Sequence, residues 1–322
     1  MFDLQESPRR ILAGWIWEQL ADIEMTSLFD PYGGDGRVSN YLKRQGRQVL
    51  VNDPLACHYW WNRALVENPN EALSLVRQDA LQQPHADESR FTGFADWAGR
   101  YFSDEEVGWL GRWYLNIGSQ GLSEGEQALA HVAVYWTIGY WLDHNQRYIQ
   151  DKAMAPHEVF QTYMEQANAW VYDNGMPNAA YCGDPYDLAA DMPTDALLLV
   201  APPMAGWAEA SLRTRLWEGW TQGNAQAPLA VPGDEAGPKL GQTFTERGQY
   251  RSAIDALLAQ CEAMPYWILS YQEGAPFTRD EWVSIISLRR SGVFREATHD
   301  LTYPTAVGDS TVREGLLVMV AQ

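Results

Sequence analysis

The stretch Leu28–Asp53, LFDPYGGDGRVSNYLKRQGRQVLVND, decides the fold class of this chain. It begins with a short apolar run and a glycine-rich turn, and it ends with a second apolar run. Between them Val38, Tyr41 and Leu42 recur at helical spacing, and Gly46 is a typical residue just beyond a helix end. A strand, a helix and a strand in this order predict a βαβ unit and therefore a parallel sheet.

The same pattern returns in the C-terminal part of the chain. Three runs predict further strands: AAYCGD (179–184), ALLLVAPP (196–203) and MPYWILSYQEG (264–274). The last two runs, FREATHDLTYP (294–304) and EGLLVMVAQ (314–322), predict an antiparallel pair at a sheet edge. We expect an α/β fold with a mostly parallel sheet that carries this pair.

The middle of the chain has a different pattern. Its apolar residues follow helical periodicity, no run predicts a strand, and Ser103, Ser123 and Pro156 stand where helices are expected to begin. We therefore predict two parts. An α/β domain is made of residues 1–68 and 178–322, and a helical insertion spans residues 69–177.

Composition limits the class of protein. No run approaches 18 uninterrupted apolar residues, so no membrane span is expected. The N-terminus lacks the features of a signal peptide. Cys57, Cys182 and Cys261 lie far apart, which argues against a disulfide framework or a zinc site. We expect a cytoplasmic protein without a metal.

The net charge of −19 bears on nucleic-acid partners. Between Phe91 and Gly175, within the predicted insertion, eleven acidic residues stand against four basic ones. A DNA-reading element with this balance would be repelled by the phosphate backbone. Double-stranded DNA is therefore a disfavoured partner.

The glycine turn and the acid that ends the next strand predict a cofactor site. Gly33, Gly34 and Gly36 let the backbone turn sharply and approach a ligand closely. Asp53 follows Gly36 by 17 residues, where an acid can hydrogen-bond a ribose. The alternative is a turn that only begins a helix, with Asp53 as a cap. Asp184, the last residue of the 179–184 run, has two readings as well: it contacts an adenine amine, or it caps the helix that follows.

Taken in order, these segments resemble the Dam-type adenine-specific DNA methyltransferases. The resemblance extends over almost the whole chain and rests on these stretches: SPRRILAGWI (7–16), LFDPYGGDGRVSNYLKRQGRQVLVND (28–53), YFSDEEVGWLGRWY (101–114), GEQALAHVAVYW (125–136), YCGDPYDL (181–188), ALLLVAPPMAG (196–206) and YWILSYQEGAPFTRDEW (266–282). It implies a methyltransferase-like, Rossmann-type sheet that binds S-adenosylmethionine, with a helical target-recognition insertion.

The resemblance also implies roles for individual residues. The glycines would face the amino-acid end of the cofactor, Asp53 would hold its ribose, and Asp184 would contact its adenine amine. The cofactor-binding residues implied are Tyr32, Gly33, Gly34, Asp35, Gly36, Asp53 and Asp184.

The chain departs from the family at the catalytic motif. Where the family has Asp-Pro-Pro-Tyr, this chain has Ala201, Pro202, Pro203 and Met204. In the family, the Asp carboxylate accepts a hydrogen bond from the target adenine amine, and the Tyr stacks on the base. Loss of one aligned acceptor at the reacting amine costs roughly 3 kcal/mol, or about a hundredfold in rate. Asp195 is expected at the wrong end of its strand to replace it.

Two functions follow from this comparison. The favoured one is a relative impaired or inactive in adenine methylation, which keeps a cofactor pocket and acts as a binding or partner subunit. The alternative is an active S-adenosylmethionine-dependent adenine methyltransferase, or one with an altered substrate.

The insertion also carries a group of tryptophans. Any exposed subset of this group predicts a surface for a protein partner or a second copy of the chain. The tryptophans are Trp97, Trp109, Trp113, Trp136, Trp141 and Trp170.

Overall fold

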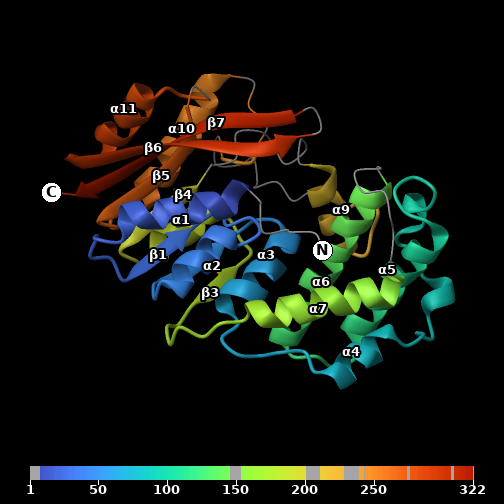
Figure 1. The fold of residues 1–322 in the computed structure, drawn as a ribbon. Coiled ribbons are helices and arrows are strands. Elements are labelled where there is room, and N and C mark those ends of the chain that lie inside the picture. Colours follow the sequence, from blue (N-terminus) through green and yellow to red (C-terminus); the bar gives the residue numbers. More distant parts are fainter. Residues whose placement is uncertain are drawn as a thin grey trace. The chain divides into compact units, whose positions relative to one another are not determined.

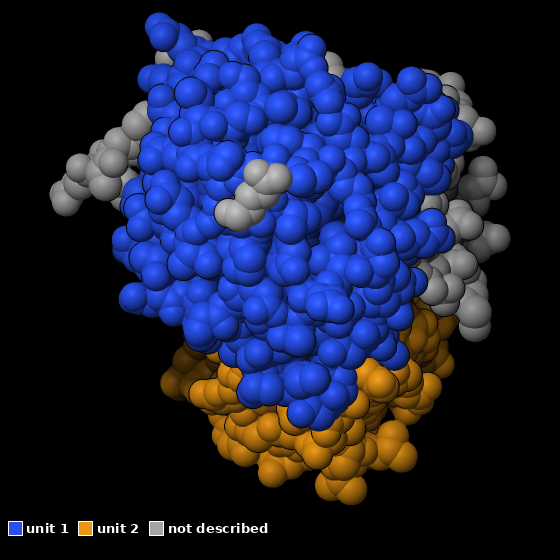
Figure 2. Space-filling view, turned by 90° about the vertical axis from the view of Figure 1, so that its left-hand side faces the viewer, with its two compact units in different colours: residues 1–54, 174–209, 231–322 blue, residues 55–173, 210–230 orange. Residues whose placement is uncertain are grey.

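A computed structural model describes residues 8–145, 154–200, 211–227, 239–242, 244, 246–273, 276–305 and 308–321. The chain divides into two compact units (Figure 2). Unit 1 comprises residues 1–54, 174–209 and 231–322, and unit 2 comprises residues 55–173 and 210–230.

Unit 1 is built on one sheet of seven strands, in the order β3-β2-β1-β4-β5-β7-β6. The strands are β1 (Ser27–Asp30), β2 (Gln48–Asn52), β3 (Ala179–Tyr181), β4 (Ala196–Val200), β5 (Tyr266–Gln272), β6 (Gly292–Thr305) and β7 (Gly308–Ala321). Strands β1 to β5 pair in parallel, whereas β7 runs antiparallel to both β5 and β6. The predicted α/β fold, a mostly parallel sheet with an antiparallel edge pair, is confirmed.

Helices cover both faces of this sheet (Figure 1). They are α1 (Pro8–Leu20), α2 (Arg37–Arg44), α8 (Pro185–Asp191), α10 (Arg247–Gln260) and α11 (Arg279–Arg289). A core of Leu197, Leu199 and Trp267 packs against α8, α10 and α11. Leu198 and Ile268 alternate with them, are equally buried and point to the opposite face. Burial on both faces explains why the central strands are continuous apolar runs.

The edge hairpin is longer than predicted, because β6 and β7 each have 14 residues. The difference lies mainly in β7, which begins at Gly308 rather than near Glu314, because the mostly polar residues 308–313 gave no strand signal in the sequence. The polar part of the hairpin pairs as well, through the hydroxyls of Thr302 and Thr311 at 2.8 Å and an ion pair between Arg313 and Asp300 at 2.7 Å. Cross-strand polar pairs of this kind stabilise a hairpin without an apolar pattern.

Unit 2 is helical in its described residues. Its elements are α3 (Ala56–Asn62), the π-helical turn η2 (Arg63–Glu67), α4 (Leu75–Gln82), the short turns η3 (Glu88–Arg90) and η4 (Ala95–Trp97), α5 (Asp104–Ser119), α6 (Glu124–Asn145), α7 (Pro156–Trp170) and α9 (Leu212–Thr221). The helix starts are those expected: Ser103 forms a capping box with Glu106, Ser123 accepts the N–H of Glu126, and Pro156 begins α7. No helix among the described residues is long and apolar enough to cross a membrane.

The boundaries of unit 2 differ from those expected for the insertion. The unit begins at Leu55 rather than at residue 69, ends its first segment at Asp173, and includes residues 210–230. Helices α3 and α9 both pack on α6, and the carboxylate of Glu218 on α9 accepts the N–H groups of Ala56 and Cys57 at 3.2 and 2.8 Å. This contact joins residues about 160 positions apart in sequence, so helical periodicity alone does not reveal it.

Candidate functional site

The loop after β1 is organised by the aspartate that ends the strand. Asp30 Oδ1 accepts the N–H of Tyr32 at 3.3 Å, and its Oδ2 accepts the Ser39 hydroxyl at 2.6 Å. Gly34 and Gly36 adopt φ values of 56° and 69°, in the left-handed region that favours glycine. Gly36 is also the residue before α2. The sharp turn predicted from the glycines is therefore formed by the backbone.

The glycine loop is joined to the end of β2, as the sequence predicts. The N–H of Gly34 donates to Asp53 Oδ2 at 3.0 Å, and the N–H of Gly33 donates to the backbone oxygen of Asn52 at 2.9 Å. Asp53 is only 1% exposed. The structure thus brings together the two parts of the predicted cofactor site.

Asn52 is a residue of this site that sequence reasoning missed. Its amide nitrogen donates to the backbone oxygens of Pro31 at 3.1 Å and Gly183 at 3.2 Å, and its Oδ1 accepts the N–H of Gly183 at 2.9 Å. One buried side chain therefore ties the ends of β1, β2 and β3 together. The available signal was a polar residue at the end of the apolar run VLVN.

Asp184 has the capping role that was its alternative reading, together with a second contact. Its Oδ1 accepts the N–H of Tyr186 at 2.9 Å, which caps α8, and its Oδ2 forms an ion pair with the Lys239 ammonium. Lys239 lies 55 residues away in sequence. No local pattern indicated this pairing.

Tyr32 lies near both acids, Asp53 and Asp184. Burial raises the pKa of its hydroxyl well above the ordinary value, and the neighbouring Tyr186, Asp184 and Asp53 raise this pKa further. Residues from the ends of β1, β2 and β3 therefore meet around Tyr32. In open α/β sheets, ligands bind at the carboxyl ends of the strands, which is where this group lies.

The degenerate motif, Ala201, Pro202, Pro203 and Met204, lies outside the described residues. The strand before it, β4, ends at Val200, which is paired with Ser270 of β5. Ser270 is fully buried, and its hydroxyl has no hydrogen-bond partner among the described residues.

Asp195 lies at the opposite end of β4 from the motif, as predicted. Its Oδ2 accepts the N–H groups of Thr26 and Ser27 at 2.6 and 3.1 Å, so it ties the start of β1 to the start of β4. Burial alone would raise the pKa of Asp195, but the hydrogen bonds from Thr26 and Ser27 hold that pKa below its ordinary value. Its role is structural.

The tryptophans of unit 2 are mainly packing residues. Trp97, Trp113, Trp136 and Trp141 are buried, whereas Trp109 and Trp170 are half-buried. Among the described residues, the exposed large apolar side chains of this unit are Leu75, Val76 and Tyr172. The structure therefore uses the predicted tryptophan group to build a helical core.

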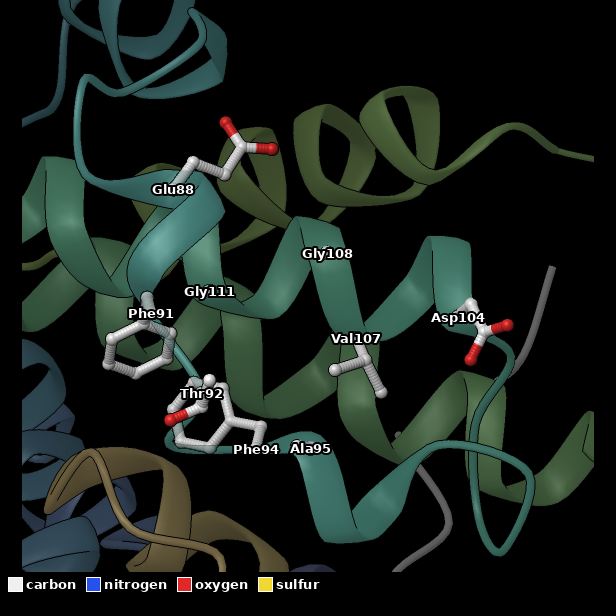
Figure 3. A pocket seen from close by; sticks show the side chains of 9 residues that line it. All are labelled: Glu88, Phe91, Thr92, Phe94, Ala95, Asp104, Val107, Gly108 and Gly111. Carbon is white, nitrogen blue, oxygen red and sulfur yellow. The ribbon is translucent and has the colours of Figure 1, made fainter.

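Unit 2 also contains a small cavity of about 210 Å³ between α5 and the turns η3 and η4 (Figure 3). It is lined by Glu88, Phe91, Thr92, Phe94, Ala95, Asp104, Val107, Gly108 and Gly111. The Glu88 carboxylate already pairs with Arg112 at 2.8 Å. In the part of the chain that the structure describes, no group of three or more His, Cys, Asp or Glu side chains is placed to hold a metal ion.

Comparison with known proteins relates the chain to methyltransferases. No protein-family model matches it. It is 23% identical over 300 residues to the type II methyltransferase M2.HphI of Haemophilus parahaemolyticus, covering 86% of this chain and 84% of that protein. Among solved structures, the rRNA methyltransferase aviRa of Streptomyces viridochromogenes matches with a TM-score of 0.33 and 12% identity, covering 96% of this chain and 83% of that one. The similarity to M2.HphI over most of the chain describes a methyltransferase-like protein.

Proposed function

We propose that unit 1 binds S-adenosylmethionine at the carboxyl ends of β1, β2 and β3. The backbone of Gly33, Gly34 and Gly36 lies against the amino-acid end of the cofactor, Asp53 holds its ribose, and Asp184 meets its adenine amine. The observation that carries this proposal is the hydrogen bond from Gly34 to Asp53 at 3.0 Å, which places the turn beside the acid. Tyr32 and Asp35 complete the site.

One buried atom supports the fit of the amino-acid end. Asp35 Oδ2 pairs with Arg37 at 2.9 Å, but Asp35 Oδ1 is buried and has no hydrogen-bond partner among the described residues. Buried polar atoms are normally paired, because an unpaired one retains the cost of losing water. The ammonium group of the cofactor is a donor of the kind that this oxygen lacks.

For the reaction, we propose that the chain is impaired or inactive in adenine methylation and acts as a binding or partner subunit. The bound cofactor supplies an electrophilic methyl group. Ala201 has no side-chain oxygen to align a target amine, and Met204 replaces the stacking tyrosine. The acidic balance of the segment between Phe91 and Gly175 supports the same conclusion, since it opposes contact with DNA phosphates.

One observation favours a second function. The similarity to the type II methyltransferase M2.HphI covers 86% of this chain. The alternative that this similarity supports is an active methyltransferase: the S-adenosylmethionine-dependent DNA adenine methyltransferase that the sequence motifs resemble, or one that acts on a different substrate.

Calorimetry with S-adenosylhomocysteine tests cofactor binding. We expect Asp53→Asn to weaken binding by about tenfold or more, because the ribose hydroxyls lose a charged acceptor. Asp187→Asn is the matched control, because Asp187 is an exposed acid on α8. If the unmodified chain gives no heat of binding at millimolar ligand, the proposed site is rejected.

Methyl transfer to adenine in duplex DNA, followed with a labelled cofactor, tests the second part. We expect no transfer above background for the unmodified chain, and a gain of activity when Ala201→Asp is combined with Met204→Tyr. The single change Met204→Tyr is the control, because it leaves the acceptor missing. Efficient adenine methylation by the unmodified chain would establish the alternative function.

A further inference from the structure

Lys239 is positioned beside Asp184 by the residue that follows it in sequence. Leu240 is fully buried, its N–H donates to the Tyr186 hydroxyl at 2.8 Å, and its backbone oxygen accepts the Tyr32 hydroxyl at 3.3 Å. The Tyr186 hydroxyl in turn donates to the backbone oxygen of Ala253 at 3.1 Å. Tyr32 of the proposed site and its neighbour Tyr186 therefore position the backbone next to residue 239.

The ammonium of Lys239 has two partners in this position. It pairs with Asp184 Oδ2, and it lies 5.4 Å from the centre of the Tyr186 ring, in a cation–π contact. The side chains are 12% exposed for Lys239 and 20% exposed for Asp184. The pair is largely removed from water but is not sealed, so a ligand at this edge of the sheet can meet both groups.

We propose that Lys239 is a specificity-determining residue, which donates a hydrogen bond to a ring nitrogen of the adenine whose amine meets Asp184. This inference rests on the proposed cofactor site. Adenine presents an amino donor beside a ring-nitrogen acceptor, and an asparagine or glutamine amide reads that edge because it presents an acceptor beside a donor. The Asp184 carboxylate and the Lys239 ammonium form the same acceptor–donor pair from two side chains.

The proposal gives the ion pair a function beyond stability. An ion pair that is largely removed from water contributes little net stability, because its attraction is offset by the cost of desolvating both charges, and Asp184 caps α8 without help from Lys239. A donor that lies next to the recognition acid instead adds selectivity for adenine, because a base that lacks the ring nitrogen offers no acceptor to the remaining N–H of the ammonium.

Three ligands test this by calorimetry: S-adenosylhomocysteine and its 1-deaza and 7-deaza analogues, each of which lacks one ring nitrogen next to the amine. For the unmodified chain, we expect one analogue to bind about tenfold more weakly than the parent. For Lys239→Met, we expect the affinity for S-adenosylhomocysteine to fall about tenfold. We expect its affinity for that analogue to equal the affinity of the unmodified chain for the same analogue. Such non-additivity shows a direct contact.

Two variants separate recognition from a structural role. Lys239→Arg keeps a donor and is expected to recover most of the parent affinity. Arg289→Met removes the ion pair with Asp255 between α11 and α10, and is expected to leave the ratio between parent and analogue unchanged. A thermal melt of each variant confirms that it is folded.

The remaining outcomes overturn the inference in distinguishable ways. If the unmodified chain binds all three ligands equally, or if Lys239→Met keeps the same ratio, Lys239 does not read the ring and the proposed function stands. If Lys239→Met binds the parent more tightly, the ion pair blocks the adenine position instead. If the unmodified chain binds none of the three, the proposed function fails together with this inference.

Discussion

His131 is kept neutral by its surroundings in unit 2. Its ring stacks on Trp60 at 4.5 Å, and its Nδ1 lies 3.1 Å from the Tyr135 hydroxyl. The side chain is 7% exposed, and burial lowers its pKa to about 3. This residue belongs to the helical core. The change of its protonation state therefore affects folding stability.

Stability is therefore expected to depend on pH through this side chain. Between pH 6.5 and about 3, the unfolded chain binds a proton at His131 and the folded chain does not. The free energy of unfolding then falls with decreasing pH, by up to about 1.4 kcal/mol per pH unit. We expect His131→Gln to reduce this slope in urea denaturation between pH 7.5 and 5. His157→Gln, at an exposed position, is the control, and equal slopes in both variants would contradict the prediction.

Among the elements, α3 depends on a carboxylate from a distant helix. Glu218 is 1% exposed and accepts two N–H groups at the start of α3, while the Gln222 amide donates to its Oε1 at 2.8 Å. A carboxylate at this end also complements the positive end of the helix dipole. Helices α3 and α9 are thereby joined within unit 2.

Removal of this cap is expected to destabilise unit 2. Glu218→Ala leaves the N–H groups of Ala56 and Cys57 buried without their acceptor, at a cost of about 2–3 kcal/mol. Glu105→Ala, an exposed acid on α5, should change stability by less than about 0.5 kcal/mol. Chemical denaturation followed by tryptophan fluorescence measures both variants. If Glu218→Ala loses no more free energy of unfolding than Glu105→Ala, the cap does not stabilise unit 2.

The edge hairpin places a glycine against an aromatic ring. Gly315 of β7 is paired with Tyr271 of β5, and a Cβ atom at residue 315 would overlap the Tyr271 ring. Tyr271 is 5% exposed, so its ring has little room to move. We expect Gly315→Ala to cost about 1–3 kcal/mol in the free energy of unfolding.

A second glycine serves as the matched control for that change. Gly248, on α10, has open space where a Cβ atom would lie. Gly248→Ala is therefore expected to stabilise the chain by about 0.5–1 kcal/mol, because alanine favours a helix. If thermal melts show both variants shifted in the same direction, the overlap with Tyr271 is not what destabilises Gly315→Ala.

At the scale of the whole molecule, the net charge of −19 governs contact with polyanions. Affinity for duplex DNA comes mainly from cations that replace counterions on the phosphates. We expect fluorescence anisotropy to give a dissociation constant weaker than about 100 µM at about 150 mM salt. Submicromolar binding that weakens steeply with added salt would contradict this expectation and would favour the alternative, an active DNA methyltransferase.

The sequence predicted the fold class because the signals for it are local. Alternating and continuous apolar runs predicted all seven strands, and the order of strands and helices predicted the parallel sheet. The link between Gly34 and Asp53 was also predictable, since the ends of neighbouring parallel strands meet at one edge.

What only the tertiary structure decided is the set of contacts between residues far apart in the chain. Asn52 joins three strand ends, Lys239 reaches Asp184, and Glu218 brings α9 to α3. None of these follows a helical or strand period, because each depends on where separate elements pack. By itself, therefore, the sequence determined the sheet and hence which strand ends share one edge, whereas side-chain packing decided which groups meet there and where each compact unit begins and ends.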